Sequence, residues 1–256
     1  MLAPGRPDRI RVAVESAGRY GIERVRAAAA ASCSGDDAVR QRAGLLVLGA
    51  LGIDDDAARD ELVEAATRLG GSGDAQVRTA LAEALGLCST DGRTTTPLLE
   101  LARDADPMVR LAAVLGLSIP AEDEPEDGGE VAALLLLKMD DTEPDVRDWA
   151  TFALGVQRDI DSPQLRDALM RRLADEDSDA AGEAAVALAR RGDLRVLPVL
   201  LARLDDLDVG NLWVEAAAEL AHPSALPALR RLRDAGWGAD DPRPEVLDEA
   251  ISRCAG

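Results

Sequence analysis

The chain has 256 residues, of which 47% are apolar and only 2% aromatic, and its 48 Asp and Glu against 29 Lys and Arg give a formal charge of −19. This apolar content excludes wholesale disorder, and a composition dominated by Ala, Leu and Val favours packed helices over sheets. The negative charge disfavours binding to nucleic acid or to anionic membranes, since it repels phosphate at long range.

A helical pattern recurs along the chain at intervals of 32 to 38 residues. In one clear copy, Val146 is followed by Arg147, and Ala150, Leu154 and Gly155 stand four, eight and nine positions after the valine. Positions zero, three, four, seven and eight share one side of a helix, so each copy predicts an amphipathic helix. The zero positions, in chain order, are Val39, Val77, Val109, Val146, Ala180, Leu212 and Val246.

The starts of these helices carry recognisable signals. Asp74, Asp106-Pro107 and Glu143-Pro144 place an acidic residue near the N-cap, and the last two add Pro at the first helical position. The first copy is imperfect, because its Leu48-Gly49 pair comes one residue late relative to Val39.

A second series of shorter helical segments lies between the copies, with Thr96-Pro97 and Ser162-Pro163 as cap-plus-proline starts. Two helices per period predict an antiparallel hairpin, and hairpins that cannot bury both faces alone must stack. We therefore predict an all-α, right-handed α-solenoid of about seven hairpins, forming a single domain over residues 1–256 with an acidic loop at about 119–130. The segments of the second series are 57–70, 96–104, 130–139, 162–175, 196–206 and 225–236.

Little in the sequence indicates catalysis, a metal or a cofactor, and we expect none of them. Cys33, Cys88 and Cys254 are far apart, so buried thiols are expected rather than disulfides or a zinc site. The only histidine, His222, is expected in a turn. No apolar run approaches the ~20 residues of a membrane span, so a cytoplasmic location is the default, and we expect a monomer.

The phrase D-x-x-V-R-x-x-A-x-x-x-L-G, with the turns at 192–204 and 221–232, resembles bacterial HEAT repeats, including the phycobilisome-lyase variety, over nearly the whole chain. This resemblance implies the solenoid fold but leaves activity open, because such solenoids host adaptors, lyases, hydroxylases and glycosylases. It also implies a ladder of Asp–Arg pairs between successive repeats. In repeat four, Arg147 keeps the Arg, but Glu143 stands where Asp is usual. Ala181 and Trp213 stand in the Arg position of repeats five and six, so the ladder is expected to break there. The implied pairs are Asp36 with Arg40, Asp74 with Arg78, and Asp106 with Arg110.

Positions two and six of the pattern are expected to form rows on the concave side of the solenoid. Trp149, at position three, is expected to fill the core, whereas Phe152 at position six is a candidate exposed anchor. The rows mix apolar and acidic side chains, which suits a partner protein or peptide with basic and apolar residues. The candidate partner-binding residues are Gln41, Leu45, Thr79, Glu83, Leu111, Leu115, Asp148 and Phe152.

We therefore predict a non-catalytic scaffold or adaptor that binds neither nucleic acid nor membrane. The alternative is an enzyme or chromophore-handling lyase that uses the same groove. The acidic segment 120–130 is a second candidate docking strip, for a basic partner.

Overall fold

The computed structural model describes residues 15–238 and 245–256. Within these ranges every regular element is a helix and none is a strand, which confirms the all-α prediction. The chain divides into two compact units, residues 1–131 and 132–256. This division does not test whether the chain is a single domain, which stays a prediction.

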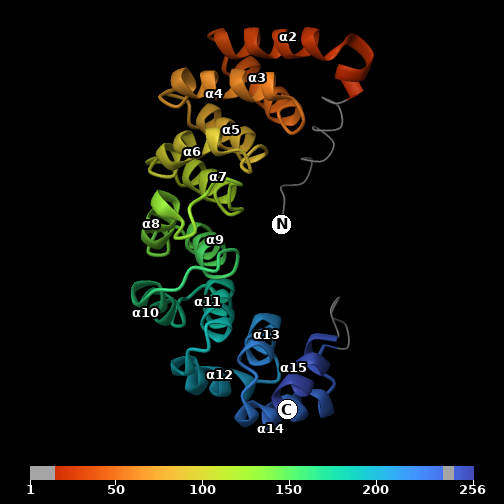
Figure 1. Ribbon diagram of the computed structural model, residues 1–256, viewed down its shortest axis with the longest axis vertical. Coiled ribbons are helices and arrows are strands. Elements are labelled where there is room, and N and C mark those ends of the chain that lie inside the picture. The colour runs from red at the N-terminus through yellow and green to blue at the C-terminus, as the bar shows by residue number, and fades with distance from the viewer. Residues whose placement is uncertain (1–14, 239–244) are drawn as a thin grey trace. The chain divides into compact units, whose positions relative to one another are not determined.

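Unit 1 consists of stacked helical hairpins (Figure 1). In each hairpin the second helix carries the repeated pattern, and these second helices pack in series, α3 against α5 and α5 against α7. The hairpins are α2 (Ile22–Ser34) with α3 (Ala38–Leu51), α4 (Asp56–Leu69) with α5 (Ala75–Gly86), and α6 (Thr95–Leu101) with α7 (Pro107–Gly116). A short 3-10 turn, η1 (Gly92–Thr94), precedes α6.

Unit 2 continues the same hairpin arrangement, and the boundary between the units falls inside α8 (Gly129–Lys138). Its second helices also pack in series, α9 against α11, α11 against α13, and α13 against α15. The other helices are α9 (Pro144–Gly155), α10 (Pro163–Arg172), α11 (Ser178–Arg190), α12 (Leu197–Leu204), α13 (Asn211–Leu220), α14 (Leu226–Asp234) and α15 (Glu245–Ala255). The 3-10 turns η2 (Leu194–Val196) and η3 (Pro223–Ala225) precede α12 and α14.

All seven copies of the pattern are helices, which confirms the HEAT-like solenoid class. The six predicted partner segments are helices α4, α6, α8, α10, α12 and α14. The first partner helix, α2, was missing from the predicted series; its sequence is rich in Ala and lacks the cap-plus-proline start.

The apolar stripe of the pattern forms the core. Val77, Val109 and Val146 are fully buried, and Leu85 and Leu154 are buried eight positions further on. The first copy is a correction, because Val39 is 65% exposed while Leu48 is fully buried. The true frame of α3 therefore starts one residue later than predicted, in agreement with its late Leu-Gly pair.

Glycine at position nine allows the second helices to approach closely. A Cβ on Gly49 would lie 2.8 Å from the Cα of Ala84, on the neighbouring helix α5. In unit 2, a Cβ on Gly155 would lie 2.7 Å from the Cβ of Ala187 on α11. Both distances are below normal contact, so a larger residue would push the helices apart.

The helix start signals act largely as predicted. Asp74 caps α5 by accepting from the amide of Gln76, and Asp106 caps α7 by accepting from Met108. Glu143 precedes α9 without making a side-chain cap bond. The expectation for His222 is confirmed, because its Nδ1 accepts from the amide of Ser224 at the start of η3.

An Arg–Asp ladder is present, but its partners differ from those predicted. Arg78 pairs with Asp104, which lies 26 residues further along, and not with Asp74. Arg110 donates to the backbone carbonyls of Asp104 and Ala105. The predicted carboxylates Asp74 and Asp106 cap their own helices instead, whereas Asp104 faces the arginine of the preceding repeat.

The remaining sequence features lie in the connections and the core. Cys33, Cys88 and Cys254 are free and buried, as expected. The acidic segment 120–130 runs from α7 into α8 mostly without helix, and the amide of Glu122 donates to the carbonyl of Thr90. No helix among the described residues has the length and apolar character needed to cross a membrane.

Candidate partner-binding surface

The most distinctive surface lies on the second helices of unit 2. Helix α9 begins at Pro144, and its stripe of Val146, Ala150 and Leu154 faces the core. Asp148 and Phe152 are four residues apart, so they lie one turn apart on the same face of α9. Both are half-buried, and this places them at the border between core and surface.

Phe152 is held by a neighbouring aromatic side chain. The rings of Trp149 and Phe152 lie edge to face, with centroids 5.6 Å apart and an interplanar angle of 84°. Trp149 is itself half-buried, so it supports Phe152 rather than filling the centre of the core. An edge-to-face pair of this kind fixes the orientation of a partly exposed ring.

Asp148 lies next to a second unusual carboxylate, Glu183 of α11. Burial raises the pKa of Asp148 to about 7, with further contributions from the charges of Asp177, Asp179 and Asp145. Burial likewise raises the pKa of Glu183 to about 7, and the next largest cause is the charge of Asp148. The Oδ1 atom of Asp148 is buried and has no hydrogen-bond partner in the described part of the chain. The two carboxylates thus form a half-buried pair on adjacent helices.

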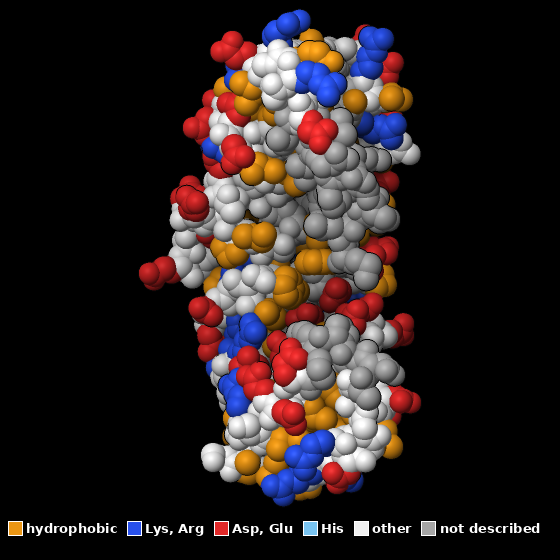
Figure 2. Space-filling view, turned by 90° about the vertical axis from the view of Figure 1, so that its right-hand side faces the viewer, with side chains coloured by type: hydrophobic (Ala, Val, Ile, Leu, Met, Phe, Trp, Pro, Cys, Tyr) orange, Lys and Arg blue, Asp and Glu red, His pale blue; other side chains and the backbone are white. Residues whose placement is uncertain are grey.

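Helix α13 extends this acidic surface with Glu215 and Glu219. Arg190 of α11 approaches both, with its guanidinium nitrogens 3.8 Å from Glu215 Oε1 and 3.5 Å from Glu219 Oε1. Arg253 of α15 lies 3.5 Å from Glu219 Oε2. In the space-filling view, acidic side chains gather on this face of unit 2 at the level of α9 to α13 (Figure 2).

The predicted row residues of unit 1 have a different character. Thr79 donates to the carbonyl of Ala75 within its own helix, and Glu83 is half-buried one turn further on. Leu111 and Leu115 of α7 are half-buried as well. Because α5 packs against α7, these four side chains lie on neighbouring helices, and they include only one carboxylate.

The two row positions of α3 differ from the prediction. Leu45 is fully buried, so no partner can reach it on the folded surface. The one-residue slip of the first copy explains this, because Leu45 occupies position five of the true frame, a position that is also buried in other copies, as at Ala82 and Val114. Gln41 is half-buried, and its side chain donates to the carbonyl of Gly35 at 2.7 Å.

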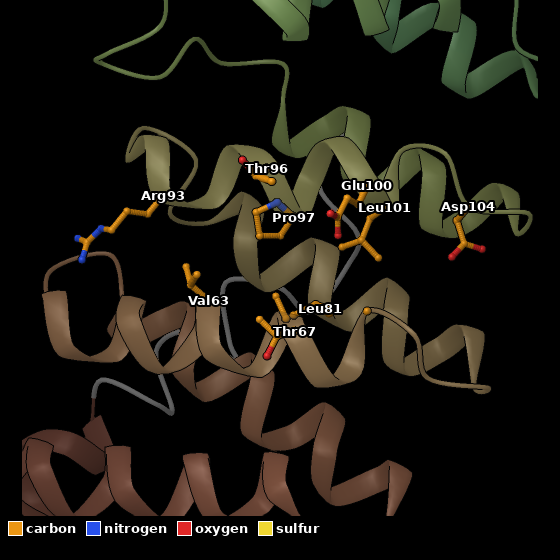
Figure 3. A pocket seen from close by; sticks show the side chains of 11 residues that line it. Val63, Thr67, Leu81, Arg93, Thr96, Pro97, Glu100, Leu101 and Asp104 are labelled. Atoms are coloured by element: carbon orange, nitrogen blue, oxygen red, sulfur yellow. The ribbon is translucent and has the colours of Figure 1, made fainter.

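Unit 1 also contains a pocket of about 340 Å³ between its first helices α4 and α6. Figure 3 shows Val63 and Thr67 of α4 opposite Pro97 and Leu101 of α6. At its rim, Asp104 is engaged by Arg78. The pocket is lined mainly by first-helix residues and is not part of the second-helix rows.

Sequence reasoning missed Glu183 as a member of the surface. It lies at position three of the fifth copy, whereas the predicted rows used positions two and six. Position three borders the core, where a charged side chain is costly, and Glu183 stands there in an Ala-rich helix. That mismatch between a buried position and a charged residue was the signal that could have found it.

A family model for HEAT repeats matches residues 131–212, which comprise most of the surface just described. Residues 131–212 are therefore HEAT repeats, and the helical hairpins on both sides of them have the same form. The family match covers 82 of the 256 residues, and it does not distinguish the phycobilisome-lyase variety.

Among curated proteins, the chain is similar to Protein YibA of Escherichia coli K12, with 33% identity over 120 residues. The alignment covers 47% of this chain and 41% of YibA, so it spans less than half of either protein. The crystal structure of Escherichia coli YibA superimposes with a TM-score of 0.69 and 24% identity, covering 97% of this chain and 82% of that one. An engineered protein of known structure gives a TM-score of 0.60 at 18% identity, covering 98% of this chain and 74% of its own. These two likenesses bear on the fold alone.

Proposed function

We propose that this chain is a non-catalytic protein-interaction scaffold, and that the second-helix surface of unit 2 binds a partner segment carrying basic and apolar residues. The observation that carries the proposal is the half-buried pair Asp148 and Glu183 beside Phe152. Neither carboxylate has an ion-pair partner within the described ranges, although both lie in surroundings that disfavour an unpaired charge.

A cation from a partner would relieve this electrostatic cost. Carboxylates that are already partly desolvated lose less hydration on binding, and they interact more strongly with a cation than exposed ones do. Phe152 supplies an apolar contact one turn away, and aromatic side chains of this kind often dominate interface energetics. An amphipathic helix with basic and apolar residues on one face offers both groups at matching spacing.

The HEAT-repeat fold is compatible with this role, since stacked repeats present extended surfaces. The cytoplasmic location, the monomeric state and the absence of a cofactor remain part of the proposal. The enzyme or lyase alternative would place a small molecule on the same surface.

The test uses a synthetic 18-residue amphipathic helix with Leu and Lys on one face, titrated calorimetrically against the full chain. Phe152→Ala is expected to weaken binding by roughly 1–3 kcal/mol, as loss of an aromatic anchor does. Asp148→Asn is expected to weaken binding mainly at low salt, because screening at about 0.1 M already acts over ~10 Å.

Leu194→Ala is the matched control, because Leu194 is an exposed apolar residue of unit 2 outside this surface. A peptide in which Glu replaces every Lys should not bind. Wild-type affinity of both Phe152→Ala and Asp148→Asn would refute the proposed surface. Binding of a small chromophore to this surface would favour the enzyme or lyase alternative.

A further inference from the structure

In the Arg–Asp ladder, the loop carboxylates Asp104 and Asp175 each bind the guanidinium group of an arginine. Arg78 forms two parallel bonds with Asp104, Nε to Oδ2 at 2.6 Å and Nη2 to Oδ1 at 2.9 Å. Arg147 binds Asp175 in the same way, at 2.9 and 2.8 Å. Each carboxylate therefore holds a guanidinium by its two-pronged edge, a geometry that lysine cannot supply.

Asp206 is the equivalent carboxylate in the next repeat. Its Oδ1 accepts from the amide two residues later, that of Asp208, at 3.0 Å. Asp104 and Asp175 accept in the same manner from the amides of Asp106 and Asp177, at 2.8 and 3.0 Å. The same local turn thus presents the same carboxylate at all three positions.

The arginine that should reach Asp206 is absent. Arg78 and Arg147 stand at position one of the second helix before their carboxylate, and the corresponding residue of α11 is Ala181. The arginine that stands three residues before each carboxylate also differs between the two repeats. Arg172 donates to Asp175, whereas Arg203 lies over the ring of Trp213, 5.1 Å from its centroid.

The space beside Asp206 is a pocket of about 530 Å³, within the range of small-ligand pockets, roughly 300–1,000 Å³. Its acidic side chains come from the start of α11 and the loop after α12, and its apolar ones from the start of α13. The turn is held in place by Trp237, whose indole nitrogen donates to the carbonyl of Val209 at 2.8 Å. The pocket lining includes Asp179, Arg203, Asp206, Asp208, Leu212 and Trp213.

We propose that this pocket binds an arginine side chain of a partner protein, with Asp206 accepting two bonds from its guanidinium as Asp104 and Asp175 do within the chain. Leu212 supplies apolar surface for the aliphatic part of the arginine, beside the Trp213 ring that Arg203 covers. Three carboxylates against the single guanidinium of Arg203 leave the pocket negative. Selectivity for arginine over lysine follows from the two-pronged contact.

This proposal goes beyond the surface around Phe152 and does not depend on it. Asp179 lines the pocket and also contributes to the raised pKa of both Asp148 and Glu183, so the two surfaces adjoin within unit 2. A partner could use one surface without the other, and the two proposals can fail separately.

The test titrates the full chain with two capped tripeptides, Gly-Arg-Gly and Gly-Lys-Gly, and follows the amides of 205–213 and the Trp213 indole by NMR. The arginine peptide is expected to bind at least about fivefold more tightly, with shifts centred on Asp206 and Asp208. Asp206→Asn should weaken binding of the arginine peptide about tenfold, because the carboxylate loses its charge and one of the two oxygens that accept from the guanidinium. Phe152→Ala should leave this binding unchanged.

Asp205→Asn is the matched control, because it removes the same charge one residue away, at a carboxylate that pairs with Arg231 outside the pocket. It should change the affinity by less than about twofold, as expected for an exposed charge outside the site. Equal binding of the two peptides, equal loss in the two variants, or shifts that avoid residues 205–213 would each overturn the proposal.

Discussion

The repeats around α9 and α11 differ in one residue that changes the role of the next loop. Arg147 of α9 binds Asp175, whose side chain is only 2% exposed, and so ties one repeat to the next. Ala181 of α11 leaves Asp206 exposed beside a pocket. A single position of the pattern thus separates a structural ion pair from a carboxylate available to a ligand.

The largest expected effect tests whether the two units share the same kind of core. Leu85→Ala in unit 1 and Leu154→Ala in unit 2 are each expected to cost about 2–5 kcal/mol of unfolding free energy, as is Leu117→Ala. All three leucines are buried at position eight of their copies. Urea unfolding followed by circular dichroism measures the loss.

Leu137→Ala is the control for these variants, because Leu137 is 71% exposed on α8. Its expected change is below about 0.5 kcal/mol. Equally small losses at Leu85, Leu117 and Leu154 would mean that the frame of the repeat is wrong.

The next effect concerns the ladder itself. Arg147→Ala is expected to cost about 1.5–3 kcal/mol at pH 7, because it leaves the nearly buried Asp175 with fewer charged donors. Asp206→Asn is expected to stay within about 0.5 kcal/mol, since Asp206 has no ladder arginine to lose. Denaturant unfolding of both variants compares the two repeats directly.

The pH dependence of the Arg147 effect provides a further check. Hydrogen bonding to Arg147 lowers the pKa of Asp175 to about 2, against an ordinary value of about 3.9. The folded state therefore binds fewer protons than the unfolded state between these values, so the stabilisation is complete above about pH 4 and is lost towards pH 2. The difference between wild type and Arg147→Ala should shrink over that window; a constant difference would contradict the ion pair as its source.

The sequence predicted the helices well because burial leaves a periodic signal in each of them. It failed where two signals competed, as at α3, where the Val39-Arg40 start and the Leu48-Gly49 end disagree by one residue. In the structure Leu48 is buried and Val39 is exposed, because a leucine buries more apolar area than a valine does. The spacing of residues alone cannot decide which residue of α3 is position zero, because that depends on which side chains contact the neighbouring helix.

The ladder and the acidic pair depended on contacts between repeats, which sequence spacing does not reveal. Asp104 and Asp106 are two residues apart and chemically identical, yet one faces Arg78 and the other caps α7. Phe152 and Asp148 lie on one face of α9 because they are four residues apart, and their role in binding stays a prediction. Glu183 enters the surface from another helix, and only the packing of α9 against α11 brings it to Asp148.

A smaller effect is expected from the acidic pair of unit 2. Asp148→Asn combined with Glu183→Gln should raise the unfolding free energy at pH 8 by about 1 kcal/mol, a value discounted for the partial access of water to both groups. The pKa of each carboxyl is raised to about 7, so the folded state binds more protons than the unfolded state between about pH 4 and 7. Wild-type stability should therefore fall as the pH rises through this window.

The double variant should lack this fall, and urea unfolding at pH 4.5, 6 and 8 measures it. Asp159→Asn is the control, because Asp159 is exposed and belongs to the same unit. Parallel pH profiles for wild type and the double variant would show that the two carboxylates are hydrated like ordinary surface groups.

The smallest expected effect concerns the sixth repeat, where Trp213 stands in the Arg position. Arg203→Met should cost roughly 0.5–1 kcal/mol, because it keeps a flexible apolar stem over the ring but removes the cation–π attraction. Arg230→Met, at an exposed arginine of α14, is the control and should be neutral. If both variants unfold alike in urea, the stacked guanidinium contributes nothing measurable. A real loss at Arg203 alone would mean that this repeat keeps a guanidinium contact of its own after the ladder has ended, with the ring in place of the carboxylate. Arg203 would then stay engaged with the Trp213 ring rather than with Asp206, which is the condition that the arginine pocket requires.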